Sequence, residues 1–155
     1  HVAACCGVVD GFDDPADASS SISSKPDAMV LFNPTLDTIS LDRRIKRFGG
    51  LETARSLSPL HNVRPGAPPS LVMHGRADEL VDVDETIRFG EAMVAAGNHC
   101  DVRLYENQGH GFFNYFDGGN PMFTETLREM DAFLVRQDFF DGKDRIDSFT
   151  ITNSL

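Results

Sequence analysis

Short apolar runs along this chain are separated by amphipathic stretches, and their periods predict strands and helices. Residues 28–32 are continuously apolar between breakers that contain proline and asparagine, which is typical of a strand buried on both faces. A second apolar run covers 70–73 and ends at a His-Gly pair. Residues 100–105 alternate apolar with polar side chains, which predicts a third strand nearer the edge of the sheet.

Two later segments have apolar residues at helical spacing. The first, 82–97, begins with Asp82 and Glu85, a pair that resembles a capping box. Its apolar face consists of Phe89, Ala92, Met93 and Ala96. The second helix is expected to start at Asn120-Pro121, and its buried stripe to consist of Phe123, Leu127, Met130 and Leu134.

The stretch 37–68 is expected to be a long excursion between the first and second strands, because it is punctuated by glycines and prolines. It carries a basic cluster of Arg43, Arg44, Lys46 and Arg47. A solvated helix face is the simpler interpretation of this cluster, and the steering of an anionic ligand is the alternative.

Strands that alternate with helices predict an α/β fold, in which a parallel sheet with flanking helices is joined by right-handed crossovers. In such sheets the loops that follow the strands meet at one edge, and ligands bind there. Candidate chemistry is therefore expected directly after Phe32, Met73 and Tyr105.

The composition fits one globular domain and narrows the classes of partner. The chain has 155 residues and a formal net charge of −10, which argues against a nucleic-acid backbone or an anionic membrane as the main partner. No run approaches the ~18 apolar residues of a membrane span.

The cysteines and histidines show neither a disulfide framework nor metal-ligand spacing, so no metal or other cofactor is expected. Because the chain begins at His1 rather than Met, no compartment is assigned.

An aspartate and a histidine follow consecutive predicted strands. Asp78 lies a few residues after the second strand, and His110 lies between two glycines after the third. Since the two strands are expected to be neighbours, both side chains should meet at one edge of the sheet. A carboxylate beside an imidazole fixes its tautomer, and the imidazole then moves a proton for a nucleophile. Taken alone, His110 is explained equally well as a solvated or hydrogen-bonded loop residue, and Asp78 is better explained as a helix cap or a turn residue. His74 is expected to be buried and to support the turn.

Four stretches carry a resemblance to a known superfamily. Residues 68–78 contain a strand followed by His-Gly-x-x-Asp, 109–112 read Gly-His-Gly-Phe, 25–34 form a strand before an excursion, and 58–60 read Ser-Pro-Leu. Together they resemble the esterase/lipase branch of the α/β-hydrolase superfamily over residues 1–137, with acetyl-xylan and feruloyl esterases as the nearest type. Residues 138–155 are expected to be a tail of unknown role in which 148–152 could form a short strand.

The resemblance implies a carboxylic ester hydrolase of the Ser-Asp-His type that acts on small acyl or carbohydrate-linked esters. It places the acid of the triad on Asp78 and the base on His110. Asn33, Phe112 and Phe113 are expected to line the substrate pocket, although core packing explains the two phenylalanines equally well.

The nucleophile motif of the family, Gly-x-Ser-x-Gly, does not occur in the chain. The opening residues resemble the helix after this motif, with His1 three residues beyond the serine. We therefore expect the chain to be the C-terminal part of the domain, nearly inactive alone, and to associate with the missing N-terminal half or with itself. The alternatives are a non-catalytic binding or assembly domain of this fold, and a peptidase or dienelactone-type hydrolase.

Overall fold

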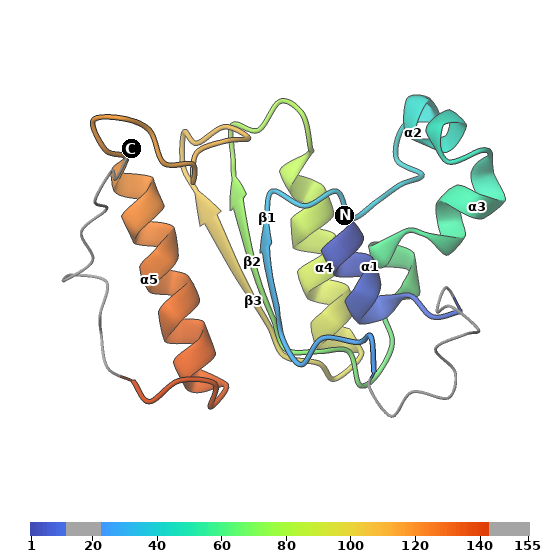
Figure 1. Ribbon diagram of the computed structural model, residues 1–155. Coiled ribbons are helices and arrows are strands. Elements are labelled where there is room, and N and C mark those ends of the chain that lie inside the picture. The colour runs from blue at the N-terminus through green and yellow to red at the C-terminus, as the bar shows by residue number, and fades with distance from the viewer. Residues whose placement is uncertain (12–22, 143–155) are drawn as a thin grey trace. The chain divides into compact units, whose positions relative to one another are not determined.

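The computed structural model describes residues 1–11 and 23–142, and the chain divides into two compact units, His1–His110 and Gly111–Leu155. The described elements of the first unit are α1 (Val2–Val8), β1 (Met29–Phe32), α2 (Asp42–Arg47), α3 (Leu51–Ser56), the 3-10 helix η2 (Pro59–Asn62), β2 (Ser70–Gly75), α4 (Val83–Ala95) and β3 (Cys100–Tyr105) (Figure 1). The second unit contains α5 (Pro121–Arg136). The predicted strand at 148–152 lies outside the described residues.

The strands β1, β2 and β3 form a parallel sheet in that order, which confirms the predicted α/β architecture (Figure 1). Ser70 of β2 pairs with Met29 on one side and with Cys100 on the other. Within the described residues β3 ends the sheet, as its alternating pattern predicts. Because the strands are parallel, the segments that follow them leave the sheet at a common edge.

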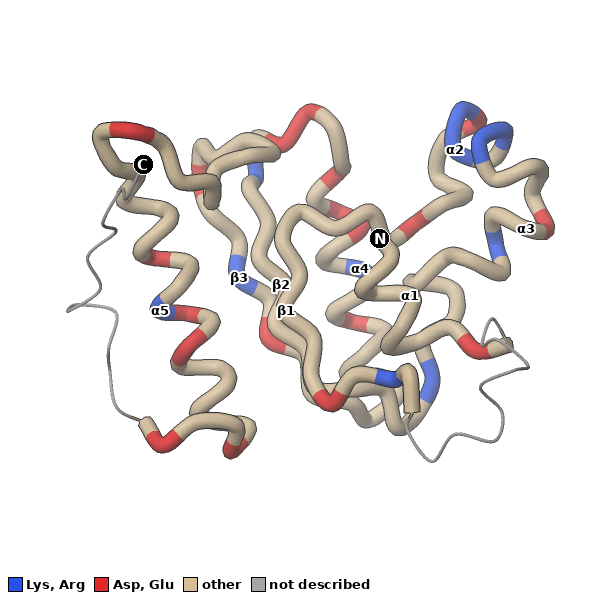
Figure 2. Tube along the Cα trace, viewed as in Figure 1, with Lys and Arg blue, Asp and Glu red and all other residues tan. Residues whose placement is uncertain are grey.

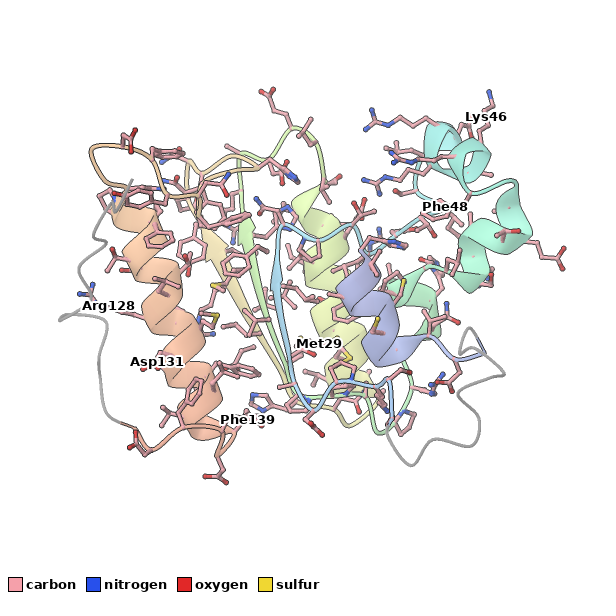
Figure 3. The ribbon with its side chains drawn as sticks, in the orientation of Figure 1. Met29, Lys46, Phe48, Arg128, Asp131 and Phe139 are labelled. Carbon is pink, nitrogen blue, oxygen red and sulfur yellow. The ribbon has the colours of Figure 1, made fainter. Side chains whose placement is uncertain are left out.

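The core of the first unit lies between the sheet and a layer formed by α1 and α4, and Figure 1 shows both helices on the same side of the sheet. Its buried residues are Ala4, Val8, Met29, Leu31, Leu36, Val72, Phe89 and Met93. The predicted apolar face of the 82–97 segment is confirmed for Phe89 and Met93, which are completely buried, whereas Ala92 and Ala96 are only half-buried. Met29 points from β1 toward α1, where Gly7 leaves room for its sulfur (Figure 3).

The start of α4 departs from the predicted capping box. Asp82 caps the helix, because its side chain accepts a hydrogen bond from the N–H of Asp84 at 2.9 Å. Glu85 turns elsewhere, and its carboxylate accepts hydrogen bonds from the N–H groups of Leu36 at 3.1 Å and Asp37 at 3.0 Å. The capping-box prediction is therefore wrong for Glu85, because a buried segment of the excursion offers it two donors that no local pattern reveals.

The basic cluster of the excursion divides between surface and interior. Arg43, Lys46 and Arg47 are exposed on α2, where Figure 2 shows the basic residues grouped along the helix, and Lys46 points outward in Figure 3. Arg44 is buried and pairs with Glu85. A solvated face is therefore the wrong interpretation for Arg44, whose buried charge is stabilised by a carboxylate partner.

In the second unit, α5 starts as predicted, with proline in its first turn and a hydrogen bond from the N–H of Met122 to the Asn120 side chain at 3.0 Å. Its buried residues are Thr126 and Phe133, whereas the predicted stripe is only partly buried. A threonine is tolerated there because its hydroxyl donates to the Met122 carbonyl oxygen at 2.9 Å. None of the described helices is long and apolar enough to cross a membrane.

Stability is expected to fall at high pH through Cys100. Burial, and then the charge of Asp101, raises the pKa of Cys100 from 9.0 to about 12. Between these values the unfolded thiol ionises while the folded thiol keeps its proton, so stability falls as the pH rises, by about 1.4 kcal/mol per pH unit. Urea unfolding of the wild type and Cys100→Ala at ~pH 8 and ~pH 10.5 tests this, and the advantage of the wild type should shrink by about 2 kcal/mol. An unchanged difference between the two proteins would contradict it.

Candidate active site

Asp78 lies in the tight turn that follows β2. Its carboxylate closes the turn, because Oδ1 accepts hydrogen bonds from the N–H of Leu80 at 2.8 Å and the N–H of Val81 at 3.1 Å. Aspartate suits this position, since its short side chain reaches backbone N–H groups two and three residues ahead. The side chain is fully buried, and Oδ2 is left for other partners.

One of these partners is the imidazole of His110, in the loop after β3. Nδ1 of His110 lies 2.8 Å from Oδ2 of Asp78. Since a carboxylate oxygen only accepts, Nδ1 carries the proton and Nε2 is the basic nitrogen. The side chain of His110 is 43% exposed, so the pair combines a buried acid with an accessible base. The structure thus brings together the two residues that the strand order predicted to meet.

The environment of Asp78 keeps its carboxylate ionised. Burial acts to raise its pKa, but hydrogen bonds from His110 and from the N–H groups of Val81 and Leu80, with the charge of His110, outweigh burial and hold the pKa below the ordinary 3.8. The resulting stabilisation is present above that value and is lost as the pH falls through the lower, folded-state pKa. An ionised Asp78 can orient His110 and stabilise its protonated form.

The loop of His110 lies directly against the end of β2. The N–H of Ala77 donates to the carbonyl oxygen of Gln108 at 2.9 Å. A Cβ at Gly75 would collide with the carbonyl groups of Gln108 and Gly109, so only glycine permits this approach. The glycine of the His-Gly-x-x-Asp stretch therefore allows the loop that carries Asp78 and the loop that carries His110 to lie in direct contact.

Asn33, which the sequence predicts to line the substrate pocket, lies at the end of β1 against the loop of His110, and its contact with a substrate stays a prediction. It is buried at the end of β1 in a left-handed conformation, with φ of 40°. Its Oδ1 accepts a hydrogen bond from the N–H of Gly75 at 2.9 Å, and its Nδ2 donates to the carbonyl oxygens of Gly109 and His110. Because both ends of the amide are engaged, this placement favours holding the His110 loop against β2 over contact with a substrate.

Phe112 and Phe113, the other two expected pocket residues, belong to the second unit. Their rings pack edge to face at 5.6 Å between centroids, and Phe112 is buried. This geometry agrees with the packing interpretation of the two residues. Their contact with a substrate stays a prediction.

His74 is completely buried at the end of β2, as the sequence predicted. Its Nδ1 lies 2.7 Å from Oγ1 of Thr86, and its Nε2 lies 3.2 Å both from the carbonyl oxygen of Val81 and from Oδ2 of Asp78. Burial lowers the pKa of His74 despite the opposing effects of Val81, Asp78 and Glu85. The ring is therefore neutral at neutral pH.

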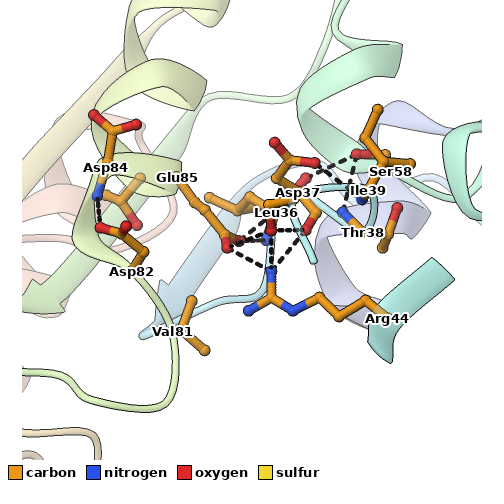
Figure 4. Close-up of polar contacts among 12 residues, drawn as sticks. Leu36, Asp37, Thr38, Ile39, Arg44, Ser58, Val81, Asp82, Asp84 and Glu85 are labelled. Atoms are coloured by element: carbon orange, nitrogen blue, oxygen red, sulfur yellow. Dashed lines mark hydrogen bonds and ion pairs between the residues drawn. The ribbon is translucent and has the colours of Figure 1, made fainter. Parts of the chain in front are cut away.

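A buried network that the sequence analysis missed attaches the excursion to α4 (Figure 4). Glu85, which is 2% exposed, pairs with Nη1 of Arg44. The same nitrogen donates to the carbonyl oxygen of Asp37 at 2.7 Å and to Oγ of Ser40 at 3.0 Å. Local patterns could not find this network, because Glu85 and Arg44 are 41 residues apart.

A polar hollow of about 370 Å³ lies beside the Asp78 turn, and Arg43, Arg76 and Leu80 are among the residues that line it. Of the exposed residues of the basic cluster, Arg43 thus borders the turn that carries Asp78. The steering of an anionic ligand by the cluster stays a prediction. Across residues 1–11 and 23–142, no group of three or more His, Cys, Asp or Glu side chains is placed to hold a metal ion.

Comparison with known proteins gives one family and a set of similar structures. Residues 40–137 match the model of the prolyl oligopeptidase family, Peptidase_S9. No curated protein matches the chain. A propionate-bound thermophilic esterase from the Planctomycetes species Thermogutta terrifontis is 36% identical, with a TM-score of 0.79 over 91% of this chain and 53% of its own.

Two further structures of the Thermogutta terrifontis esterase 2 agree with this match. The apo form is 36% identical, with a TM-score of 0.80 over 90% of this chain and 53% of its own. The form phosphorylated by paraoxon is 36% identical, with a TM-score of 0.77 over 90% of this chain and 51% of its own. The chain therefore spans about half the length of these solved structures.

Proposed function

Since the chain belongs to the prolyl oligopeptidase family and has the α/β-hydrolase fold, we propose that it supplies the acid and the base of a serine hydrolase that cleaves carboxylic esters. The observation that carries this proposal is the 2.8 Å contact between Nδ1 of His110 and Oδ2 of Asp78. The acid is buried and the base is partly exposed, which suits general base catalysis on a bound nucleophile.

The nucleophile of this reaction is a serine from polypeptide upstream of His1. Nε2 of His110 takes the proton of the serine hydroxyl as its oxygen attacks the ester carbonyl carbon, and backbone N–H groups stabilise the oxyanion that forms. His110 returns the proton to the leaving alcohol oxygen as the C–O bond breaks. Water then attacks the acyl-serine by the same route and releases the acid, while Asp78 stays ionised and orients His110 throughout.

Esters of small acyl groups are the proposed substrates. The similar esterase structures include one with propionate bound and one with butyrate bound. Another of these esterase structures is phosphorylated by paraoxon. The resemblance to acetyl-xylan and feruloyl esterases extends the proposal to carbohydrate-linked esters.

Peptide-bond hydrolysis is the second candidate, and the family match favours it, because that family is described as prolyl oligopeptidases. The same acid and base serve both reactions, since each proceeds through a tetrahedral intermediate on serine. The two candidates differ in the leaving group, which is an alcohol in one and an amine in the other.

The proposed enzyme is completed by the polypeptide upstream of His1. In the described sheet β1 is an outer strand that pairs with β2, and its other edge is where we propose that a strand of the upstream polypeptide adds to the sheet. The chain is expected to associate through this edge with the upstream segment, or with a second copy of itself when that segment is absent.

The test compares the chain alone with a joined polypeptide, in which the sequence that precedes His1 in the gene is fused to the chain. The joined polypeptide should hydrolyse p-nitrophenyl propionate, and the chain alone should be slower by about 10³-fold or more, because it lacks the nucleophile and oxyanion donors. Adding the separate upstream segment to the chain should restore activity. Faster cleavage of a prolyl p-nitroanilide would favour the second candidate, and hydrolysis of neither substrate would refute the proposal.

A further inference from the structure

We propose that His74 is a positioning residue for the Asp78–His110 pair, a role that rests on the proposed hydrolase function. It acts as a neutral imidazole that holds both the carboxylate of Asp78 and the turn around it. Thr86 of α4 fixes the ring from its other side. The contacts of the ring and the burial of its surroundings carry this proposal.

The contacts of His74 assign its proton to one nitrogen. Nε2 lies 3.2 Å from the carbonyl oxygen of Val81 and 3.2 Å from Oδ2 of Asp78. Both atoms only accept hydrogen bonds here, so a bare Nε2 would place three electron-rich atoms together in a buried site. Nε2 therefore carries the proton, and Nδ1 accepts the hydroxyl proton of Thr86 across 2.7 Å.

The proposed role of Asp78 requires that His74, as a hydrogen-bond donor beside its carboxylate, be uncharged. The carboxylate stabilises the imidazolium that forms on His110 during the proposed reaction, and a second cation beside Oδ2 would weaken that effect. His74 is fully buried, and burial lowers its pKa, so it contributes a hydrogen bond without a charge. The two histidines that approach Oδ2 thus have different functions, because only His110 is exposed enough to reach a substrate.

With His74 in place, the carboxylate of Asp78 has a full set of donors. Oδ1 receives the N–H groups of Leu80 and Val81, while Oδ2 receives Nδ1 of His110 and faces Nε2 of His74. A carboxylate offers about four lone-pair sites. The side chain cannot rotate without losing several of these contacts, so the oxygen that orients His110 stays in position.

Nitrogen-15 NMR of the histidine rings in the 155-residue chain tests the protonation state directly. At ~pH 7 the ring of His74 should be neutral, with its proton on Nε2 and a bare, hydrogen-bonded Nδ1. Thr86→Val should move the Nδ1 resonance toward that of an unbonded nitrogen, and Thr86→Ser should restore it. Thr38→Val is the matched control, because it also removes a buried hydroxyl, one that donates to the Ala54 carbonyl oxygen. A charged ring, or a proton on Nδ1, would overturn the proposal.

Variants of His74 in the joined polypeptide test the positioning role. His74→Leu should lower kcat about tenfold while KM changes less than about twofold, and should shift the Nδ1–H proton resonance of His110. His74→Gln keeps an N–H donor and should recover most of the rate. Leu71→Ala is the stability control, because Leu71 is fully buried in the same strand.

An equal loss of kcat in Leu71→Ala, or a folded His74→Leu protein with unchanged kcat and His110 resonance, would refute the positioning role. Should His74→Leu fail to fold, Thr86→Val keeps the ring and still tests the tautomer. A wild-type joined polypeptide without hydrolase activity would refute the proposed function instead. The ring resonances of the 155-residue chain would then decide the protonation state of His74 separately.

Discussion

Replacing Asp78 by Asn is expected to lower kcat/KM for p-nitrophenyl propionate by about 10⁴-fold in the joined polypeptide, and His110→Ala by at least as much. Asparagine keeps an oxygen for the N–H groups of Leu80 and Val81, so the turn should survive. Its NH₂ group, however, would face Nδ1 of His110. The proton of the ring would move to Nε2, which could then no longer accept the proton of the serine.

The control for this prediction is Asp84→Asn, which makes the same chemical change at an exposed carboxylate. Asp84 lies on α4 and pairs with Arg88 at 2.8 Å. Activity should stay within about twofold there, because surface ion pairs contribute little. Asp78→Asn should still unfold cooperatively but melt below the wild type, because its NH₂ group loses the contacts that Oδ2 makes with His110 and His74. Asp84→Asn should melt as the wild type does. Full hydrolysis by His110→Ala would remove His110 from the mechanism.

Replacing Glu85 by Ala is expected to destabilise the chain by about 3–5 kcal/mol, since it leaves a buried charge without its partner. Arg44 would keep only neutral acceptors, among them the carbonyl oxygen of Asp37. The N–H groups of Leu36 and Asp37 would lose the Glu85 carboxylate as their acceptor. Urea unfolding followed by circular dichroism measures the loss.

Two comparisons separate this network from a general effect on α4. Glu91→Ala removes an exposed glutamate from the same helix and should change the free energy of unfolding by less than about 0.5 kcal/mol. The double variant Glu85→Leu with Arg44→Leu should lose less than Glu85→Ala, because no unpaired charge is left in the interior. Equal losses in Glu85→Ala and Glu91→Ala would show that the buried pair does not hold the excursion.

The candidate site was predictable where it depends on strand direction. The sequence places Asp78 and His110 after consecutive parallel strands, and parallel strands bring such residues to one edge. Asn33 also follows a strand and lies at this edge, but its contact with a substrate stays a prediction. Strand position identifies the edge of the sheet, but whether a side chain there faces solvent depends on the loops that cover it.

The position of α4 and its buried face were also predictable from the sequence. The apolar spacing of the 82–97 segment identified α4 and the burial of Phe89 and Met93, because that face repeats with the helical period. Its first turn was not fully predictable. The spacing of Asp82 and Glu85 fits a capping box, but Glu85 instead binds backbone from the excursion.

By itself, the sequence determined the order of the elements, the parallel sheet and the edge where Asp78 and His110 meet, because these follow from local periodicity and chain direction. The tertiary structure alone decided the partners of the buried polar groups, such as Arg44 with Glu85 and the Asn33 amide with the His110 loop. These contacts join residues far apart in the chain. They form because a buried donor or charge needs a partner, and the packed chain determines which group is within reach.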